Sequence, residues 1–243
     1  MKVLAVIPAR YSSSRFPGKP LALINGKPMI QMVYENVSKS DLINETIVAT
    51  DDLRIFNEVM AFGGKSIMTS PNHLNGTQRV VETYEILNDD YDIVLNIQGD
   101  EPLVKQTMIK KLIDGLADEK TLISTLKKRI KSLSDIKSRD IAKVVSNRFD
   151  EAIYFSRSII PYSDRPEVNN YYKHVGMYGY KSAFLKNYHD LDSVVIEQCE
   201  SLEQLRFLYY GISVKVLEIF DEIIGVDRPE HISLVEKKLY KKQ

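Results

Sequence analysis

The chain has 243 residues, 44% of them hydrophobic, and its 33 basic side chains are balanced by 33 acidic ones. This zero formal charge excludes a general attraction to nucleic acid or an anionic membrane, so any anion site must be local. The apolar runs are too short for a membrane span or a signal peptide core, and we expect a cytoplasmic protein. The single cysteine, Cys199, suits a reducing compartment, and we expect it to be a small core residue on a helix.

The first half of the chain predicts strands that alternate with helices. Short apolar runs predict buried strands, and apolar residues at helical spacing predict the helices between them. The strands are expected at 2–7, 46–50, 65–68 and 92–97, and the helices at 28–38, 52–62, 76–87 and 105–118. This alternation is typical of a parallel sheet with helices on both faces.

The second half of the chain has a different pattern. Strands are expected at 121–126, 142–146, 152–155 and 213–219, and helices at 196–210 and 229–240. The stretch 127–140 is highly charged and is expected to be an irregular, exposed excursion. We therefore predict an α/β fold with a mostly parallel central sheet and a mixed-sheet extension.

A basic loop follows the first predicted strand, where residues 8–20 read PARYSSSRFPGKP. Its small residues allow a ligand to approach the backbone, and its prolines limit the loop's conformations. Arg10, Arg15 and Lys19 can then face a polyanion, because ligands of open α/β sheets bind beyond the carboxyl ends of strands. The loop matches neither a Walker A motif nor a GxGxxG fingerprint, and a solvated basic loop is the alternative.

Two aspartates lie in turns that glycine and proline make rigid. Asp100 stands in QGDEP at 98–102, and Asp227 stands in GVDRP at 225–229. Two such carboxylates are a plausible pair of ligands for a hard cation. Capping of a turn by Asp100 and of the last helix by Asp227 is the alternative, and spacing alone favours it.

The motifs of this chain, taken in order, resemble those of the 3-deoxy-manno-octulosonate (Kdo) cytidylyltransferase family. PARYSSSRFPGKPL (8–21) is followed by ATD (49–51), NGTQR (75–79), NIQGDEP (96–102), KVV (143–145), YFSRSIIPY (154–162), KHVGMYGY (173–180), ESLEQLR (200–206) and GVDRPE (225–230). The resemblance implies a Rossmann-like nucleotide-diphospho-sugar transferase fold and a Mg²⁺-dependent homodimer. It also implies that CMP is transferred from CTP to the acid sugar, with release of diphosphate, for lipopolysaccharide or capsule synthesis.

The same resemblance assigns roles to residues of a nucleotide site. Lys19, Asp100 and Asp227 are implied as catalytic residues, and the two aspartates as the metal ligands. The implied nucleotide contacts are Ala9, Arg10, Arg15, Lys19, Gly76, Thr77 and Arg79. Gln78 departs from the family pattern, which has an acidic residue at that position. The departure puts the local ligand contacts in question.

The implied contacts of the acid sugar are Gln98, Arg157, His174, Tyr180, Glu203 and Gln204. Other interpretations stay open for several of them, because Arg157 could pair with a surface acid and Tyr180 could belong to the core. Glu203 and Gln204 could form the exposed face of a helix. The expected organisation is a single domain, in which 1–120 bind the nucleotide and 121–243 bind the sugar and form the dimer.

Two other functions compete with this prediction. The substrate could be another acid sugar, such as 8-amino-Kdo or a nonulosonate, because relatives that use such sugars share most of these motifs. A nucleotide sensor without catalytic activity is the alternative from another class, but it would have no need to keep Lys19, Asp100 and Asp227. A nucleic-acid-binding domain finds little support, since the chain shows no basic stripe with interleaved aromatic residues.

Overall fold

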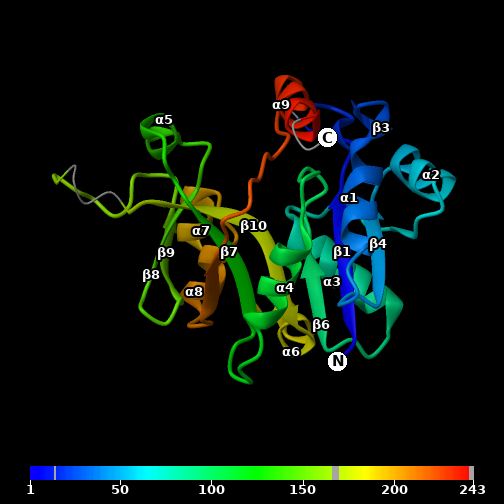
Figure 1. The fold of residues 1–243 in the computed structure, drawn as a ribbon. Coiled ribbons are helices and arrows are strands. Elements are labelled where there is room, and N and C mark those ends of the chain that lie inside the picture. Colours follow the sequence, from blue (N-terminus) through cyan, green and yellow to red (C-terminus); the bar gives the residue numbers. More distant parts are fainter. Residues whose placement is uncertain (14, 166–169, 241–243) are drawn as a thin grey trace. The chain divides into compact units, whose positions relative to one another are not determined.

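The computed structural model describes residues 1–13, 15–165 and 170–240, and Figure 1 shows its fold. The chain divides into two compact units. The first unit contains residues 1–110 and the segment from Asp221 onward, and the second contains residues 111–220. The functional division into 1–120 and 121–243 stays a prediction.

The first unit is built on parallel strands in the order β6-β1-β4-β5. Their bounds are β1 (Val3–Ala9), β4 (Glu45–Thr50), β5 (Ser66–Met68) and β6 (Ile93–Asn96). The central strands are buried almost throughout, as their continuous apolar sequence predicts for a sheet covered on both faces. In the register of β1 and β4, Ala9 lies opposite Thr50, so the loops that follow these strands start side by side.

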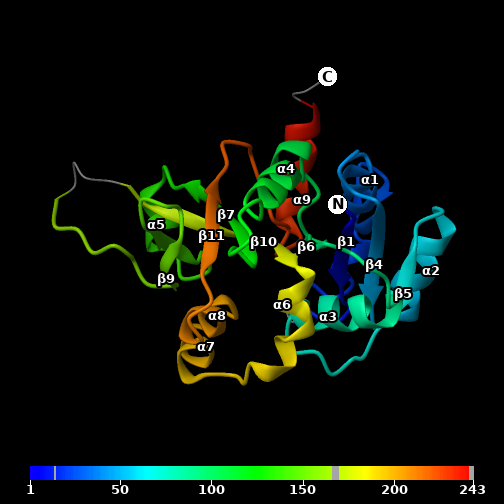
Figure 2. The same ribbon diagram turned by 90° about the horizontal axis from the view of Figure 1, so that it is seen from below.

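Helices of the first unit cover both faces of this sheet, and Figure 2 shows α1 and α3 on opposite faces. The helices are α1 (Met29–Ser38), α2 (Leu53–Ala61), α3 (Gly76–Leu87) and α9 (Glu230–Tyr240), with the 3-10 turn η1 (Lys19–Leu21) and the two-strand ribbon β2 (Leu23–Ile24) and β3 (Lys27–Pro28). The helix α4 (Gln106–Asp114) begins in the first unit and ends in the second. The predicted alternation of strands and helices is confirmed here.

The second unit contains a mixed sheet. β7 (Ile123–Arg129) pairs antiparallel with β10 (Tyr172–Lys181) and parallel with β11 (Val214–Glu218). β8 (Lys143–Ser146) pairs antiparallel with β9 (Ala152–Ser156) and with β10. The remaining elements are α5 (Leu133–Lys137), α6 (Ser182–Lys186), η2 (Tyr188–Asp190), α7 (Val195–Glu200) and α8 (Gln204–Tyr209). The predicted mixed-sheet extension is therefore confirmed.

The structure corrects several local predictions in this unit. The charged stretch 127–140 contains the end of β7 and the helix α5, and the expected helix 196–210 is two helices. The second difference arises at Ser201, whose φ of 51° ends α7 in a left-handed cap. Cys199 lies on α7 as expected, but it is exposed rather than in the core. Within the described ranges, no helix is long and apolar enough to cross a membrane.

Candidate active site

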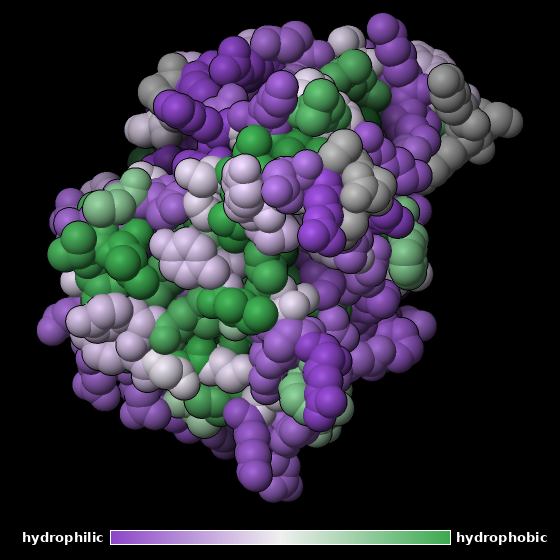
Figure 3. Space-filling view, turned by 90° about the vertical axis from the view of Figure 1, so that its left-hand side faces the viewer, coloured by the Kyte–Doolittle hydropathy of each residue, from purple (hydrophilic) through white to green (hydrophobic). Residues whose placement is uncertain are grey.

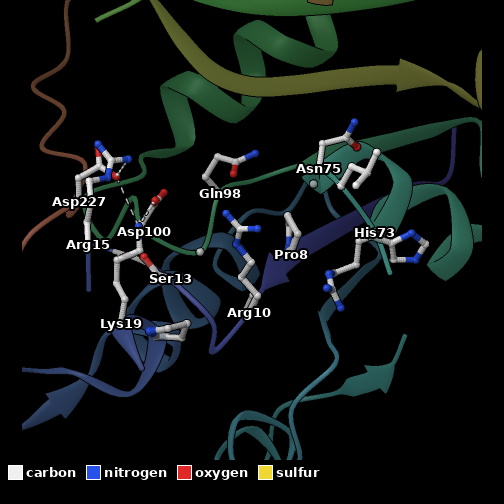
Figure 4. Close-up of a pocket in the computed structure, with 16 residues that line it drawn as sticks. Pro8, Arg10, Ser13, Arg15, Lys19, His73, Asn75, Gln98, Asp100 and Asp227 are labelled. Atoms are coloured by element: carbon white, nitrogen blue, oxygen red, sulfur yellow. Dashed lines mark hydrogen bonds and ion pairs between the residues drawn. The ribbon is translucent and has the colours of Figure 1, made fainter. Parts of the chain in front are cut away.

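A pocket lies in the first unit at the carboxyl end of β1, the position expected for the ligand of an open α/β sheet. Figure 4 shows Arg15, Lys19, Asp100 and Asp227 meeting at one end of it, and His73 and Asn75 at the other. The lining residues are Pro8, Ala9, Arg10, Ser13, Arg15, Lys19, Pro20, His73, Leu74, Asn75, Gly76, Arg79, Gln98, Gly99, Asp100 and Asp227. They include four cations and two carboxylates, so a neutral protein carries a local excess of positive charge.

The basic loop (8–20) is fixed at both ends. It leaves the buried strand β1 at Ala9 and enters the 3-10 turn η1 at Lys19, where Pro20 is buried. Phe16 packs against a hydrophobic cluster that includes Met29 and Val226, so the loop also has an apolar anchor. The cations of the loop therefore project from a constrained backbone, as the sequence predicts.

The two aspartates converge because their turns are joined by the backbone. The amide of Val226 donates a 2.9 Å hydrogen bond to the carbonyl oxygen of Asp100, and the amide of Asp227 donates to His231 Nδ1 at 3.1 Å. A side chain at Gly99 would place its Cβ 3.0 Å from the carbonyl oxygen of Pro8, a tight contact, so glycine favours the close approach of this turn to β1. Asp100 and Asp227 lie 127 positions apart in the sequence, and these contacts bring their turns together.

One ammonium group lies between the two carboxylates. Lys19 Nζ is 2.5 Å from Asp100 Oδ2 and 3.6 Å from Asp227 Oδ1, and Arg15 Nη2 is 3.1 Å from the same Asp227 oxygen. The two carboxylates can therefore contact a common cation. No group of three or more histidine, cysteine, aspartate or glutamate side chains that could hold a metal ion occurs among the described residues. The pair fits Mg²⁺, which is held by one or two carboxylates and takes its other oxygens from phosphates and water.

The other end of the pocket contains a buried cation, Arg79 of α3, which is 4% exposed. Arg79 donates to the hydroxyl of Thr69, and its Nη2 lies 3.4 Å from Asp51 Oδ1 at the end of β4. Burial lowers the pKa of Arg79, and Asp51 opposes that shift. Gly76 lines the pocket beside it, whereas Thr77 is buried on α3 and contributes no lining surface.

Gln78 has a structural role at the start of α3. Asn75 is the N-cap residue, and its side chain accepts a hydrogen bond from the amide of Gln78. In return Gln78 Oε1 accepts from the amide of Leu74 at 2.7 Å. Gln78 thus ties the residue before the N-cap to the first turn of α3, in an arrangement related to a capping box, and it does not line the pocket. The position that departs from the family pattern therefore lies outside the lining of the pocket.

Among the predicted sugar contacts, Gln98 lines this pocket, and the other five belong to the second unit. Arg157 is held there by backbone oxygens. Its Nε donates to the carbonyl of Glu200 at 2.9 Å, and its Nη1 donates to the carbonyls of Arg139 and Asp140. The buried ammonium of Lys143 donates to the carbonyl of Arg157 at 2.6 Å. The guanidinium of Arg157 therefore fastens two backbone segments together.

His174 belongs to a hydrogen-bonded chain of side chains. Its Nε2 lies 2.9 Å from Thr125 Oγ1, and its Nδ1 lies 3.3 Å from Gln204 Nε2, while Tyr178 donates to Gln204 Oε1. Burial lowers the pKa of His174 to about 3, so the imidazole is neutral at neutral pH. It can position hydroxyl groups but brings no positive charge to a sugar carboxylate.

Tyr180 and Glu203 lie among aromatic residues of the second unit. Tyr180 is fully buried and stacks on Tyr178 and Phe184, and Glu203 accepts a hydrogen bond from Tyr188 at 2.9 Å. Gln204 is 3% exposed, so it does not form an exposed helix face. The sugar-binding roles of all these residues stay predictions.

The sequence did not single out several residues that line the pocket or support it. Ser13, His73, Leu74 and Asn75 line it, and Asp51 pairs with Arg79. An asparagine before Gly76-Thr77 is an ordinary N-cap signal, so Asn75 was recognisable. His73 is bonded to Glu82 on α3, and no sequence spacing indicates that pair.

Residues 4–219 match the model of the cytidylyltransferase family. A 3-deoxy-manno-octulosonate cytidylyltransferase of Fusobacterium nucleatum is 49% identical, with 97% of this chain and 96% of that protein covered. One from Thermodesulfovibrio yellowstonii is 47% identical, with 98% of each covered. The chain belongs to the Kdo cytidylyltransferase family. The resemblance on which the sequence prediction depended is confirmed.

Solved structures agree with this membership. A CMP:2-keto-3-deoxy-manno-octonic acid synthetase complexed with CTP superposes with a TM-score of 0.93 at 42% identity, with all of both chains covered. A cytidylyltransferase from Leptospira borgpetersenii shares the fold alone, at 16% identity and a TM-score of 0.64. The predicted fold class is therefore confirmed for this member of the Kdo cytidylyltransferase family.

Proposed function

We propose that this protein is a CTP-dependent Kdo cytidylyltransferase, which joins CMP to the anomeric hydroxyl of Kdo and releases diphosphate. The observation that carries the proposal is that Asp100 and Asp227 both lie beside the ammonium group of Lys19 in the basic loop. Phosphoryl transfer needs a place where polyphosphate oxygens and a divalent cation meet, and this pocket supplies both kinds of charge. Membership of the family identifies the reaction.

The basic loop would bind the triphosphate of CTP. The guanidinium of Arg15 offers a fork of donors that matches phosphate oxygens, and Lys19 offers a point charge. Arg10 projects from the end of β1 into the same pocket, and backbone near Ala9 would contact the cytosine. Gly76 and Arg79 would lie by the base and ribose, and Thr77 supports them from the buried side of α3.

Asp100 and Asp227 would hold Mg²⁺. Bound between them, the ion would neutralise negative charge on the α-phosphate and lower the pKa of the sugar's attacking hydroxyl. The chain's own contribution is to hold the two carboxylates at one place, through the hydrogen bond between Val226 and Asp100. Positioning and charge neutralisation would supply most of the rate, so no general base is assigned.

Recognition of the sugar by Gln98, Arg157, His174, Tyr180, Glu203 and Gln204 is part of this proposal. Support is uneven among them. Gln98 lines the pocket, with its amide nitrogen donating to Asn96 Oδ1 at 3.1 Å, whereas Tyr180 is fully buried and Arg157 is bonded to several carbonyl oxygens. We expect Gln98 to contact the sugar directly and Arg157 to support the backbone around its site.

Diphosphate release in the presence of CTP and each of several purified acid sugars tests the proposal. We expect release with Kdo, and with no sugar or with UTP in place of CTP we expect little. Release with 8-amino-Kdo or a nonulosonate but none with Kdo would identify a cytidylyltransferase of another acid sugar. Tight CTP binding without diphosphate release from any sugar would favour a nucleotide sensor.

A homodimer is the expected assembly, and the second unit offers a surface for it. Figure 3 views the side that carries α5, β8 and β9 and shows hydrophobic side chains gathered there. Ile153 on β9 is 59% exposed, and Ile159 and Tyr162 just beyond it are exposed as well. We expect the Ile153→Glu variant to shift the protein from dimer to monomer in light scattering, whereas Met60→Glu, an exposed position in the first unit, leaves the mass unchanged. A monomeric wild-type protein would contradict this assembly.

A further inference from the structure

Two large side chains of the basic loop do not line the pocket: Phe16, which packs in the hydrophobic cluster, and Tyr11. It follows Arg10 directly, so its position affects the direction in which Arg10 leaves β1. The backbone at Tyr11 closes the loop, because its carbonyl oxygen accepts a 2.9 Å hydrogen bond from the amide of Gly18. Arg10 directly precedes Tyr11, and Lys19 directly follows Gly18. The first and the last cation of the loop therefore both adjoin this hydrogen bond.

The ring of Tyr11 packs against the same glycine. Gly18 has a φ of +69°, and a Cβ added to it would lie 3.1 Å from two ring carbons of Tyr11. The left-handed backbone and the close ring both require glycine here. Tyr11 therefore contacts Gly18 through its backbone and through its ring.

A cation from another element covers the ring. The guanidinium carbon of Arg54, on α2, lies 3.3 Å from the centroid of the Tyr11 ring. Arginine stacks on aromatic rings because its guanidinium is planar and weakly hydrated, and the ring attracts the positive charge. The contact joins α2 to the start of the basic loop.

Arg54 is itself held in place by Asp52. Arg54 Nε donates to Asp52 Oδ1 at 2.9 Å and Nη2 donates to Oδ2 at 2.7 Å, so one carboxylate receives the fork of the guanidinium. Asp52 is the N-cap of α2, where its side chain also accepts from the amide of Arg54. Thr50, the last residue of β4, lies opposite Ala9, the last residue of β1. Asp52 therefore follows the strand that neighbours the one from which the basic loop leaves.

From these contacts we infer that Asp52, Arg54 and Tyr11 form a clamp that positions the basic loop for the triphosphate of CTP. The clamp fixes the start of the loop near Arg10, while Arg15 and Lys19 further along it are paired with Asp227 and Asp100. None of the three clamp residues lines the pocket, so they are positioning residues that act through the loop. The inference rests on the proposed binding of CTP.

The test is a double-mutant cycle on the full chain with Tyr11→Leu, Arg54→Ala and the double variant. Calorimetry measures CTP affinity, and diphosphate release measures kcat and KM. We expect each single variant to bind CTP about two- to fivefold more weakly, and the double variant to lose no more than the larger single loss. The value of kcat at saturating CTP should stay within about twofold, because a contact that aids binding of substrate and transition state equally changes KM alone.

Conservative variants and a matched control complete the design. Tyr11→Phe keeps the ring and should bind CTP as the wild type does, and Arg54→Lys keeps the cation and should recover part of the affinity. Lys2→Ala removes a comparable contact at the opposite end of β1, where Lys2 Nζ lies 4.6 Å from the Tyr91 ring centroid and bonds to Asp89, and it should leave CTP affinity unchanged.

A second readout uses no nucleotide. Trypsin cleaves after Arg15, and we expect this cleavage to be about two- to fivefold faster in Tyr11→Leu and Arg54→Ala, since cleavage follows the population of open loop. Unchanged affinity and cleavage in the single variants, or additive losses in the double variant, would overturn the clamp. A wild-type protein that binds no CTP would instead overturn the proposed function, whatever the cleavage rates.

Discussion

The backbone amide of Val226 donates a hydrogen bond to the carbonyl oxygen of Asp100, and this contact brings the two acidic turns of the pocket together. Val226 is itself fully buried in a cluster with Met29 and Leu103, so the turn that carries Asp227 is anchored on its apolar side. The pair of carboxylates therefore belongs to a rigid frame that exists without a ligand. This frame is the basis for the first prediction.

Replacement of Asp100 by asparagine should lower kcat by about a hundredfold or more, a loss typical of removing one electrostatic group from a phosphoryl- or acyl-transfer site. Asparagine has the same shape and keeps the backbone bond to Val226, so the fold should be retained. Diphosphate release measures the loss, and thermal melting checks the fold. Near-normal turnover of Asp100→Asn would refute its role as a metal ligand.

Replacement of Lys19 by alanine should strengthen binding of Mg²⁺ to the nucleotide-free protein. In the present arrangement the ammonium lies 2.5 Å from Asp100 Oδ2 and 3.6 Å from Asp227 Oδ1, so it competes with any cation for both carboxylates. Loss of that competition should raise the affinity for Mg²⁺ by about fivefold or more, given charge interactions of about 1 to 4 kcal/mol at this separation. Calorimetry with MgCl₂ measures the affinity.

The Lys19 experiment has a matched control in Lys27→Ala. The ammonium of Lys27 bonds to Glu35 at 2.7 Å outside the pocket, so its removal should not change the affinity for Mg²⁺. Equal Mg²⁺ affinities of Lys19→Ala and the wild type would show that the ammonium does not hold the metal ligands in the free protein.

The stability of the protein should fall on acidification because His174 is buried neutral. Its pKa is about 3 in the folded protein and about 6.5 in an unfolded chain, so the unfolded state binds the proton first. The contribution is fully present above pH 6.5 and is lost as the pH falls toward 3. Within that window the slope is up to about 1.4 kcal/mol per pH unit for this one group.

Urea unfolding at several values between pH 7.5 and pH 5 measures this slope, compared between the wild type and His174→Gln. The variant should show a shallower loss, because glutamine does not titrate and can still bond to Thr125 and Gln204. Parallel slopes for the two proteins would mean that the imidazole takes up its proton equally in the folded and unfolded states, which would contradict a neutral buried histidine.

The sequence predicted those parts of the site that are set by a strand end or a rigid turn. Arg10, Arg15 and Lys19 lie in the loop that follows an apolar strand, and Asp100 and Asp227 each lie in a turn between a glycine and a proline, so their exposure to a ligand is a local property. Their convergence is not local, since it depends on the bond from Val226 across the fold. The role of the two aspartates as a pair of metal ligands was implied by the family resemblance and not by their spacing.

The largest omission of the sequence analysis is β10 (Tyr172–Lys181), the longest of the described strands. Its sequence lacks a clean alternation of polar and apolar residues, because Met177, Tyr178 and Tyr180 are all buried and the register shifts between Val175 and Tyr178. Strands buried on both faces and interrupted by a bulge give no period that a single sequence reveals. The clamp on Tyr11 was hidden for a related reason, since stacking of Arg54 depends on tertiary structure alone.

Gln78 is predicted to be a capping residue rather than a ligand contact, and two substitutions separate these roles. Gln78→Glu should keep the bond to the amide of Leu74 and add a negative charge near the positive end of α3, which should stabilise the protein by about 0.3–1 kcal/mol. Gln78→Ala should destabilise it by about 0.5–1.5 kcal/mol, since the hydrogen bond to the amide of Leu74 is lost while the side chain of Asn75 still caps the helix. Because Gln78 does not line the pocket, both variants should bind CTP with wild-type affinity. Calorimetry checks this, and a Gln78→Ala variant of unchanged stability but much weaker CTP binding would place the amide at the ligand instead of the helix end.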